Sequence, residues 1–306
     1  MDGPAILSDL TGRSAKAMVV TFNMGGVKVF SHWFGRVRKW NRSRLVRRRS
    51  DAGLPFQLGI LAIMKNEGRN IEEWIEHYLW QGVGQIYLID NGSDDNTQEL
   101  IKPWVMSGAV KVITLTERWK QEQHYWTAFQ HFKIRRQCKW LIMADLDEFW
   151  FCKDGRILSQ AVEAYDKYHV IYANWTMFGS AGHDRHPESL RMCLTRKSPD
   201  LGPHDCTKYI CRTRAISTRR KIGIHKLFGN CSGRTISDNG LLQINHYPLQ
   251  SREYFQDVKM RRGDACVPSR DQLRDWEYFE AYDSPCVVED TSLRDQVIQR
   301  KQLMMS

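Results

Sequence analysis

Four short apolar runs occur between residues 58 and 144 of the chain. They read LGILAIM, QIYLID, AVKVITL and KWLIMA, and they occupy residues 58–64, 85–90, 109–115 and 139–144. Runs of this length without alternation are typical of strands that are buried on both faces of a sheet. We expect the fourth strand to continue in extended conformation through the following residues, DLDEF.

The segments between these runs show helical periodicity. One apolar helix stripe is formed by Ile71, Trp74, Ile75, Tyr78 and Leu79. Asn70 and Glu73 predict a capping box at its start. Residues 98–104 and 121–136 predict two more helices. Strands and helices that alternate over short connections predict an α/β fold with a largely parallel central sheet flanked by helices.

Polar clusters follow three of the four predicted strands. They are KNE after the first, DNGSDD after the second and DLDE at the end of the fourth. In parallel sheets ligands bind beyond the carboxyl ends of the strands, so these clusters predict a ligand site at one edge of the sheet.

The acids of the fourth strand suggest a metal site. On an extended segment Asp145 and Asp147 point to the same side, and Glu148 points elsewhere. Two carboxylates about 6 Å apart repel by about 3 kcal/mol at an effective dielectric constant of about 20. Mg²⁺ or Mn²⁺ removes this cost and fits a site of carboxylate, phosphate and water. The alternative is a solvated loop in which one Asp caps a helix.

The net charge of +10 is concentrated at the N-terminus. Residues 1–50 hold 11 Lys and Arg but only 2 Asp and Glu, which leaves residues 51–306 near neutrality. The basic stretch is typical of a solvated tail or, with the aromatic residues among residues 28–50, of a segment that binds an anionic membrane surface. A near-neutral body argues against a nucleic-acid partner. No apolar run has the length of a transmembrane helix and no signal-peptide pattern is present, so we expect a cytoplasmic protein, peripheral at the membrane.

Five segments together resemble the family 2-like and family 92 glycosyltransferases, which are inverting enzymes of the GT-A fold. The segments read AIMKNEGRNIEEWIEHYLWQGVGQIYLIDNGSDDNT, WLIMADLDEFW, KYICRTRAI, IHKLF and INHYPLQSREYFQDVKMRRGDA. The resemblance covers roughly residues 56–265. It implies a GT-A type, Rossmann-like domain over residues 51–269. The charge distribution makes residues 1–50 a basic arm, and we expect residues 270–306 to form a helical C-terminal extension.

The resemblance also implies roles for individual residues. Asp145, Asp147 and His246 are expected to bind Mn²⁺ or Mg²⁺, with His225 as the rival of His246. The candidates for binding the nucleotide and its diphosphate are Lys65, Asn66, Glu67, Asp90, Asn91, Ser93, Asp94, Asp145, Lys208, Lys259 and Arg262. A solvated helix face explains Lys259 and Arg262 almost as well, since they follow a short helical pattern that begins at Ser251.

The reaction that we expect is transfer of one sugar from a nucleotide sugar, a UDP-sugar in the first place, to a glycan, polysaccharide or lipid-linked glycan acceptor. Inversion needs a carboxylate that takes the proton of the acceptor hydroxyl, and the candidates are Asp184, Glu188 and Asp205. Trp175 and Phe178 are candidate sugar platforms. Two alternatives remain open: a non-catalytic glycan- or nucleotide-binding module on the same fold, and a D-x-D phosphatase or nucleotidyltransferase.

Overall fold

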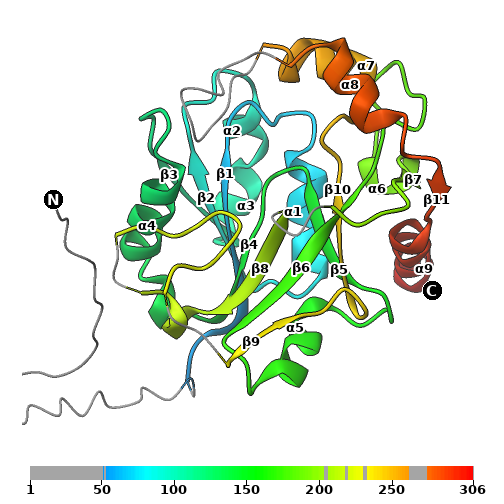
Figure 1. The fold of residues 1–306 in the computed structure, drawn as a ribbon. Helices are drawn as coiled ribbons and strands as arrows, with labels where there is room; N and C mark the ends of the chain where they lie inside the picture. Colours follow the sequence, from blue (N-terminus) through cyan, green and yellow to red (C-terminus); the bar gives the residue numbers. More distant parts are fainter. Residues whose placement is uncertain are drawn as a thin grey trace, which may run out of the picture. The chain divides into compact units, whose positions relative to one another are not determined.

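The computed structural model describes residues 51–305 apart from residues 52, 203–205, 218–219, 230–232 and 262–273. The predicted basic arm and the candidates Asp205 and Arg262 lie outside the described residues. Figure 1 shows a curled central sheet with helices on both of its faces.

Nine of the described strands form this sheet, in the order β3-β2-β1-β4-β8-β6-β10-β5, with β9 paired to β6. Their bounds are β1 Phe56–Met64, β2 Gln85–Asp90, β3 Val110–Thr114, β4 Cys138–Met143, β5 Glu148–Cys152, β6 Val170–Met177, β8 Thr207–Arg212, β9 Thr235–Ser237 and β10 Leu242–His246. β3, β2, β1 and β4 run parallel, while β8 is antiparallel to both β4 and β6. β10 is parallel to β6, and only β5 opposes it. The predicted α/β fold with a largely parallel sheet is confirmed.

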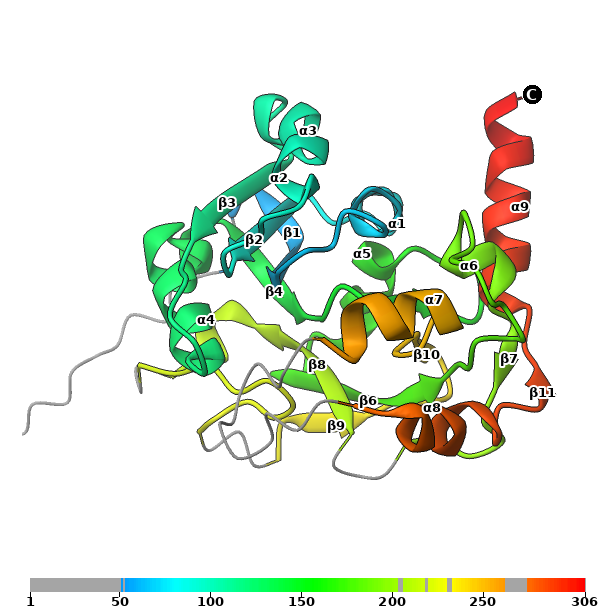
Figure 2. The same ribbon diagram turned by 90° about the horizontal axis from the view of Figure 1, so that it is seen from above.

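The helices cover the sheet from two sides (Figure 2). Helix α1, Ile71–Trp80, packs its predicted stripe against Leu58, Ile60 and Ala62 of β1. Helix α4, Gln121–His131, packs Tyr125 and Phe129 against the opposite face, where Leu61 of β1 and Tyr87 of β2 lie. Alternate residues of β1 therefore pack into two hydrophobic cores, one on each face of the sheet, which explains why the sequence of β1 is apolar throughout.

The remaining helices are short or lie toward the C-terminus. They are α2 Thr97–Leu100, α3 Lys102–Met106, α5 Leu158–Ala161, α6 Leu190–Cys193, α7 Arg252–Tyr254, α8 Trp276–Asp283 and α9 Ser292–Met305. A π-helical segment, Phe255–Lys259, continues α7. Strands β7, Arg196–Lys197, and β11, Val288–Glu289, pair as a separate small sheet. The division into an arm, a catalytic domain and an extension stays a prediction.

The predicted capping box of α1 is wrong. The Asn70 side chain makes no capping hydrogen bond; it donates to Gln250 at 2.9 Å and contacts the ring of His186. Glu73 accepts from the backbone N–H of Leu190 and from Arg191. Both side chains thus attach the start of α1 to segments more than 100 residues away, because tertiary partners compete with local capping.

The expectation of one continuous strand through DLDEF is also wrong. β4 ends at Met143, and Glu148 already begins β5, which lies at the other end of the sheet path and pairs with β10. The residues between them form a turn in which the N–H of Glu148 donates to the carbonyl of Asp145 at 3.2 Å. The chain therefore reverses at the acids, and this change decides where their side chains point.

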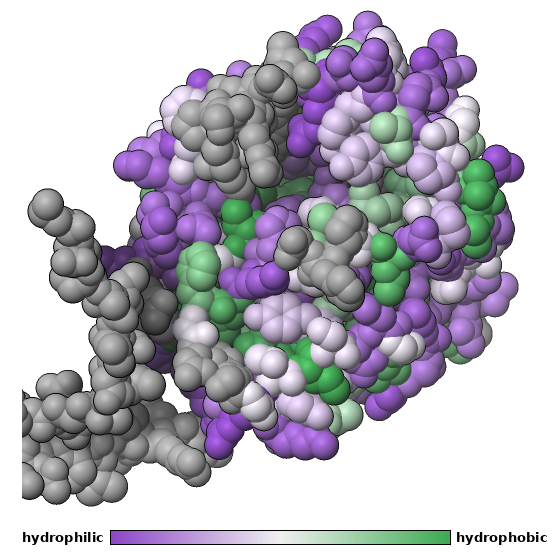
Figure 3. All heavy atoms as spheres, viewed as in Figure 1, coloured by the Kyte–Doolittle hydropathy of each residue, from purple (hydrophilic) through white to green (hydrophobic). Residues whose placement is uncertain are grey.

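Hydrophilic side chains cover most of the surface in Figure 3, and hydrophobic residues show as separate small patches. Among the described helices, none combines the length and apolar character that crossing a membrane would need.

A close approach between β1 and β4 gives a test of this core. A Cβ at Gly59 would lie 2.5 Å from Sγ of Cys138. Because overpacking a filled core typically costs 1–3 kcal/mol, we expect Gly59→Ala to lower the free energy of unfolding by about that amount. Adding Cys138→Ala removes the clashing sulfur and should recover part of the loss in denaturant titrations. A double variant no more stable than Gly59→Ala would contradict this packing.

Candidate active site

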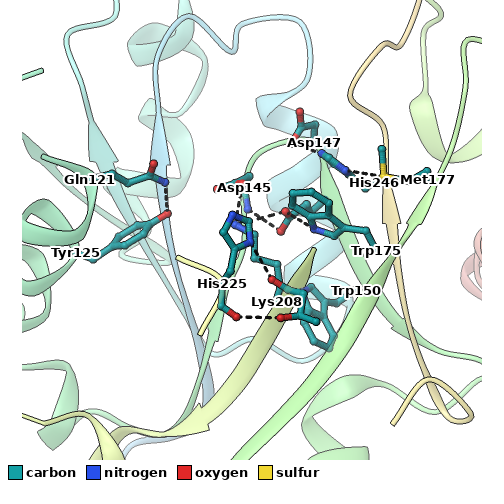
Figure 4. A network of polar contacts seen from close by, with 12 residues as sticks. Gln121, Tyr125, Asp145, Asp147, Trp150, Trp175, Met177, Lys208, His225 and His246 are labelled. Carbon is teal, nitrogen blue, oxygen red and sulfur yellow. Dashed lines mark hydrogen bonds and ion pairs between the residues drawn. The ribbon is translucent and has the colours of Figure 1, made fainter. Parts of the chain in front are cut away.

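The acidic turn between β4 and β5 lies where several strands end (Figure 4). Asp145 and Asp147 are in the turn and Glu148 begins β5. Helix α1 anchors the turn, because the indole N–H of Trp74 donates to the carbonyl of Asp145 at 3.0 Å. The backbone N–H of Tyr247 donates to the carbonyl of Asp147 at 2.9 Å. Both acids are therefore fixed through their backbones.

The turn sends Asp145 and Glu148 to a shared cation. Nζ of Lys208, on β8, lies 2.7 Å from Oδ2 of Asp145 and 3.4 Å from Oε1 of Glu148. Lys208 is 1% exposed and Glu148 is fully buried, while Asp145 is 32% exposed. The backbone N–H of Asp145 also donates to Oε2 of Glu148 at 3.0 Å. The expectation that Glu148 points away from Asp145 is wrong, since both side chains meet Lys208 and a turn does not follow the two-residue period of a strand.

Asp147 belongs to a second group of side chains. Its Oδ2 accepts from Nζ of Lys259 at 2.9 Å, and its Oδ1 lies 3.6 Å from Nε2 of His246. His246 is the last residue of β10 and pairs with Glu148 of β5 and with Met177 of β6. The other ring nitrogen of His246, Nδ1, contacts Sδ of Met177 at 3.3 Å. Two of the three predicted metal ligands are therefore brought together.

Trp175, on β6, lies between the two groups. Its indole N–H donates to Oε1 of Glu148 at 2.8 Å. Its ring packs against the ring of His246, with the centroids 4.2 Å apart and an angle of 34° between the planes. The ring of His225 meets it edge-on at 5.3 Å, and His225 Nδ1 contacts the carbonyl of Thr207 at 3.0 Å. The contacts of His225, the rival ligand, are with Trp175 and Thr207, whereas His246 is the histidine that contacts Asp147.

Charge compensation is visible in the pKa values of the buried groups. Burial alone would raise the pKa of Asp147, but Lys259 and His246 hold it well below its usual range. Burial raises the pKa of Glu148 well above its usual range, and Lys208 offsets only part of this effect. Burial would lower the pKa of Lys208, but Asp145 and Glu148 raise it instead. The pKa values of these carboxylates and ammonium groups therefore depend on one another.

The loops that follow β1 and β2 are joined by side-chain hydrogen bonds. Asn66 exchanges two of them with Asp94, at 2.7 and 2.9 Å, and its backbone N–H donates to Ser93 at 3.0 Å. Asn66 has a positive φ of 55°, so this loop conformation is held against an intrinsic preference. The N–H of Glu67 donates to Thr97 at 2.8 Å. The polar ends of two neighbouring parallel strands thus form one surface.

Asp90 has a different environment from the one expected for a residue that binds a base. It is fully buried, and its Oδ1 accepts from the N–H and the hydroxyl of Ser93 at 2.9 and 2.7 Å. Gln98 donates to its other oxygen. A hydrogen bond from a uracil ring would require one of these donors to move. Lys65 and Asp94 are exposed, and Asn91 is half-buried beside them.

Two of the candidate bases, Asp184 and Glu188, lie on a loop that contacts the start of α7. The N–H of Glu253 donates to the carbonyl of Asp184 at 2.9 Å, and the carboxylate of Glu253 accepts from the N–H of His186. Asp184 and Glu188 are both exposed. The helical segment whose start contacts this loop carries Lys259, the partner of Asp147. The structure therefore connects the candidate acceptor loop to the acidic turn through one helix.

The donor set fits a divalent cation in part. Asp147 and His246 present an oxygen and a nitrogen at a separation that one ion can bridge, and both belong to ligand types that Mn²⁺ accepts. Asp145 is held by Lys208 instead. Among the residues that the structure describes, no group of three or more His, Cys, Asp and Glu side chains is arranged to hold a metal ion. Further ligands would have to come from a diphosphate and water.

Sequence reasoning missed how the second half of the sheet contributes. Lys208 was expected at a diphosphate, but it is buried between two carboxylates. Trp175 was expected as a sugar platform, but its ring packs on His246 and its N–H binds Glu148. Glu148 was expected behind the metal ligands or facing the acceptor, but it pairs with Lys208 and accepts from Trp175. The one available signal was a lysine next to the apolar run YIC in a chain that must neutralise three acids.

The chain belongs to glycosyltransferase family 92: the sequence model of this family matches residues 64–278. The resemblance inferred from the sequence is therefore confirmed, and with it the glycosyltransferase class and the GT-A type of fold.

Similar proteins come from plants. A glycosyltransferase family 92 protein of Ricinus communis is 24% identical over 271 residues, which cover 80% of this chain and 47% of that protein. One from Arabidopsis thaliana is 24% identical over 157 residues, covering 48% of this chain and 25% of that protein. The chain thus matches about half or less of the length of these relatives.

Among solved structures, S. aureus TarS in complex with UDP-GlcNAc is similar, with a TM-score of 0.40 and 15% identity, covering 61% of this chain and 58% of that one. GalNAc-T7 with UDP, GalNAc and Mn²⁺ gives a TM-score of 0.36 and 12% identity, covering 66% and 45% of the two chains.

The pairing of Lys208 with two buried carboxylates can be tested by stability. Breaking a buried ion pair from one side typically costs 3–5 kcal/mol, so we expect Lys208→Met to lower the free energy of unfolding by about that amount. Lys221→Met is the matched control, because Lys221 is 49% exposed beside Glu122 and should change stability by less than about 0.5 kcal/mol. Adding Glu148→Gln to Lys208→Met should recover part of the loss. Equal effects of the two Lys variants in urea titrations would refute this pairing.

Proposed function

We propose that the chain is a metal-dependent, inverting glycosyltransferase that moves one sugar from a UDP-sugar to a glycan, polysaccharide or lipid-linked glycan. The observation that carries the proposal is the acidic turn after β4, with Asp147 beside His246, in a chain of glycosyltransferase family 92. The position of this turn supports it, because β1 lies between β2 and β4 and all three end at the same edge of the sheet.

The proposed roles divide the site into three parts. The surface of Asn66, Ser93 and Asp94 would receive the nucleoside. Asp147 and His246 would hold Mn²⁺ or Mg²⁺ together with the diphosphate, with Lys259 as a further cation next to it. Asp145, held by Lys208 and partly exposed, would accept a hydrogen bond from a hydroxyl of the donor.

The chemistry needs a leaving group and a base. A bound divalent cation supplies Lewis-acid stabilisation of charge on the departing nucleoside diphosphate. The protein must orient the donor so that the acceptor hydroxyl attacks the anomeric carbon from the opposite side, and a carboxylate must take the hydroxyl proton. Asp184 is our first choice for this base, because its loop is bonded to the helical segment that carries Lys259.

The metal assignment is tested with Asp147→Asn and His246→Ala. Both variants should bind Mn²⁺ at least about 10-fold more weakly and lose at least about 100-fold in transfer from UDP-sugars, since each removes a ligand that stabilises the leaving group. Electron paramagnetic resonance of free Mn²⁺ measures binding, and release of UDP from a panel of UDP-sugars and glycan acceptors measures transfer. Asp154→Asn is the control, because Asp154 is exposed and paired with Arg156.

The outcomes separate the alternatives. Wild-type protein that binds UDP with Mn²⁺ but turns over no donor would support the non-catalytic binding module. Full activity in both variants would show that the metal assignment is wrong. Release of inorganic phosphate instead of UDP would favour a phosphatase.

We also propose that the basic segment at residues 28–50 holds the protein at an anionic membrane surface. Each Lys or Arg near such a surface contributes about 1 kcal/mol, and this contribution is screened by salt. Deletion of residues 1–50 should therefore lower co-sedimentation with phosphatidylserine vesicles at least about 10-fold at low salt. Vesicles of phosphatidylcholine alone are the control. Unchanged binding to the anionic vesicles would refute the role of this segment.

A further inference from the structure

We propose that Trp175 is a positioning residue, which orients His246 by ring packing while Glu148 holds the indole in place. The inference rests on the proposed function, in which His246 is a metal ligand. It concerns how the protein fixes that ligand rather than which residues bind the ion.

The first step is the contact pattern of His246. A histidine that binds a metal through one nitrogen is usually oriented by a hydrogen bond from the other nitrogen to a carboxylate, a carbonyl or water. Here Nε2 faces Asp147, and Nδ1 faces Sδ of Met177 at 3.3 Å. A thioether is a weak acceptor, so this contact gives little orientation. The closest ring neighbour is Trp175, at 4.2 Å between centroids.

The second step is the way in which Trp175 is fixed. The N–H of its indole donates to Glu148 at 2.8 Å, and Glu148 is fully buried. Glu148 also accepts from the backbone N–H of Asp145 and pairs with Lys208. The acceptor of the indole thus has contacts from the turn, from β6 and from β8, and it cannot rotate away without breaking all of them.

Together these contacts close a ring of residues around the turn. Asp145 is linked to Glu148, Glu148 to Trp175, Trp175 to His246, and His246 to Asp147. An indole is suited to this place because its edge carries one donor while its face remains free to pack on an imidazole. The orientation of the His246 imidazole also sets the distance between its Nε2 atom and Asp147.

The test compares variants that keep or remove the aromatic face. Trp175→Phe keeps a ring against His246 but loses the N–H that Glu148 holds, and should weaken Mn²⁺ binding by less than about 10-fold, whereas Trp175→Met removes the ring as well and should weaken binding 10–100-fold, the range found for groups that orient metal ligands. Trp276→Met, at a tryptophan that is 38% exposed on α8, should leave binding unchanged. Thermal unfolding is recorded for each variant.

Two further measurements keep the inference falsifiable. Met177→Leu preserves the shape next to Nδ1 and should leave Mn²⁺ affinity within about 3-fold if ring packing orients His246; a loss as large as that expected for Trp175→Met would overturn the proposal, whether or not that variant folds. The indole N–H resonance of Trp175, assigned with Trp175→Phe, should move upfield in Glu148→Gln. An unmoved resonance would refute the anchoring contact.

Failure of this inference differs from failure of the proposed function. Wild-type protein that binds no Mn²⁺ would refute the metal site, while the indole resonance would still report on the contact with Glu148. Tight Mn²⁺ binding in wild type and equal binding in Trp175→Met would refute the positioning role and leave the metal site standing.

Discussion

Compensation of the three acids after β4 is the constraint on which the arrangement of the second half of the sheet depends. Asp145, Asp147 and Glu148 would repel one another if all three were charged, because little water is present to screen them. A buried carboxylate without a partner also costs free energy. Lys208 comes from β8 and Lys259 from the segment after α7. The strand and the helical segment that carry these cations are therefore held in place by charge as well as by apolar packing.

The parallel half of the fold could be predicted from the sequence because its information is local. The runs that became β1, β2 and β3, and the stripe of α1, appear within single elements and keep their period. The antiparallel half could not be predicted in the same way. Strands β6, β8 and β10 pair with partners far along the chain, and β5 follows an acidic turn that a two-residue period cannot describe.

The candidate site shows the same limit at the level of side chains. Asn70 and Glu73 match a capping box by spacing, but they bind Gln250, Leu190 and Arg191 because these tertiary partners are present. The residue types at the strand ends indicated an acidic site, and Asp147 and His246 were predicted as ligands of one metal ion. Whether an acid pairs with Lys208 or with Lys259 depends on the conformation of the four-residue turn between β4 and β5. The hydrophobic periodicity of the sequence does not predict that conformation.

The charge of this site is compatible with both a cation and a diphosphate. With Glu148 ionised, the three carboxylates and the two ammonium groups sum to −1, and a divalent cation changes the sum to +1. With Glu148 protonated, the sum is zero without the cation and +2 with it. In either state the site becomes positive only when the cation is bound. Under the proposed function, a negatively charged diphosphate is attracted most strongly to the cation-bound site, so binding of the two ligands should be mutually reinforcing.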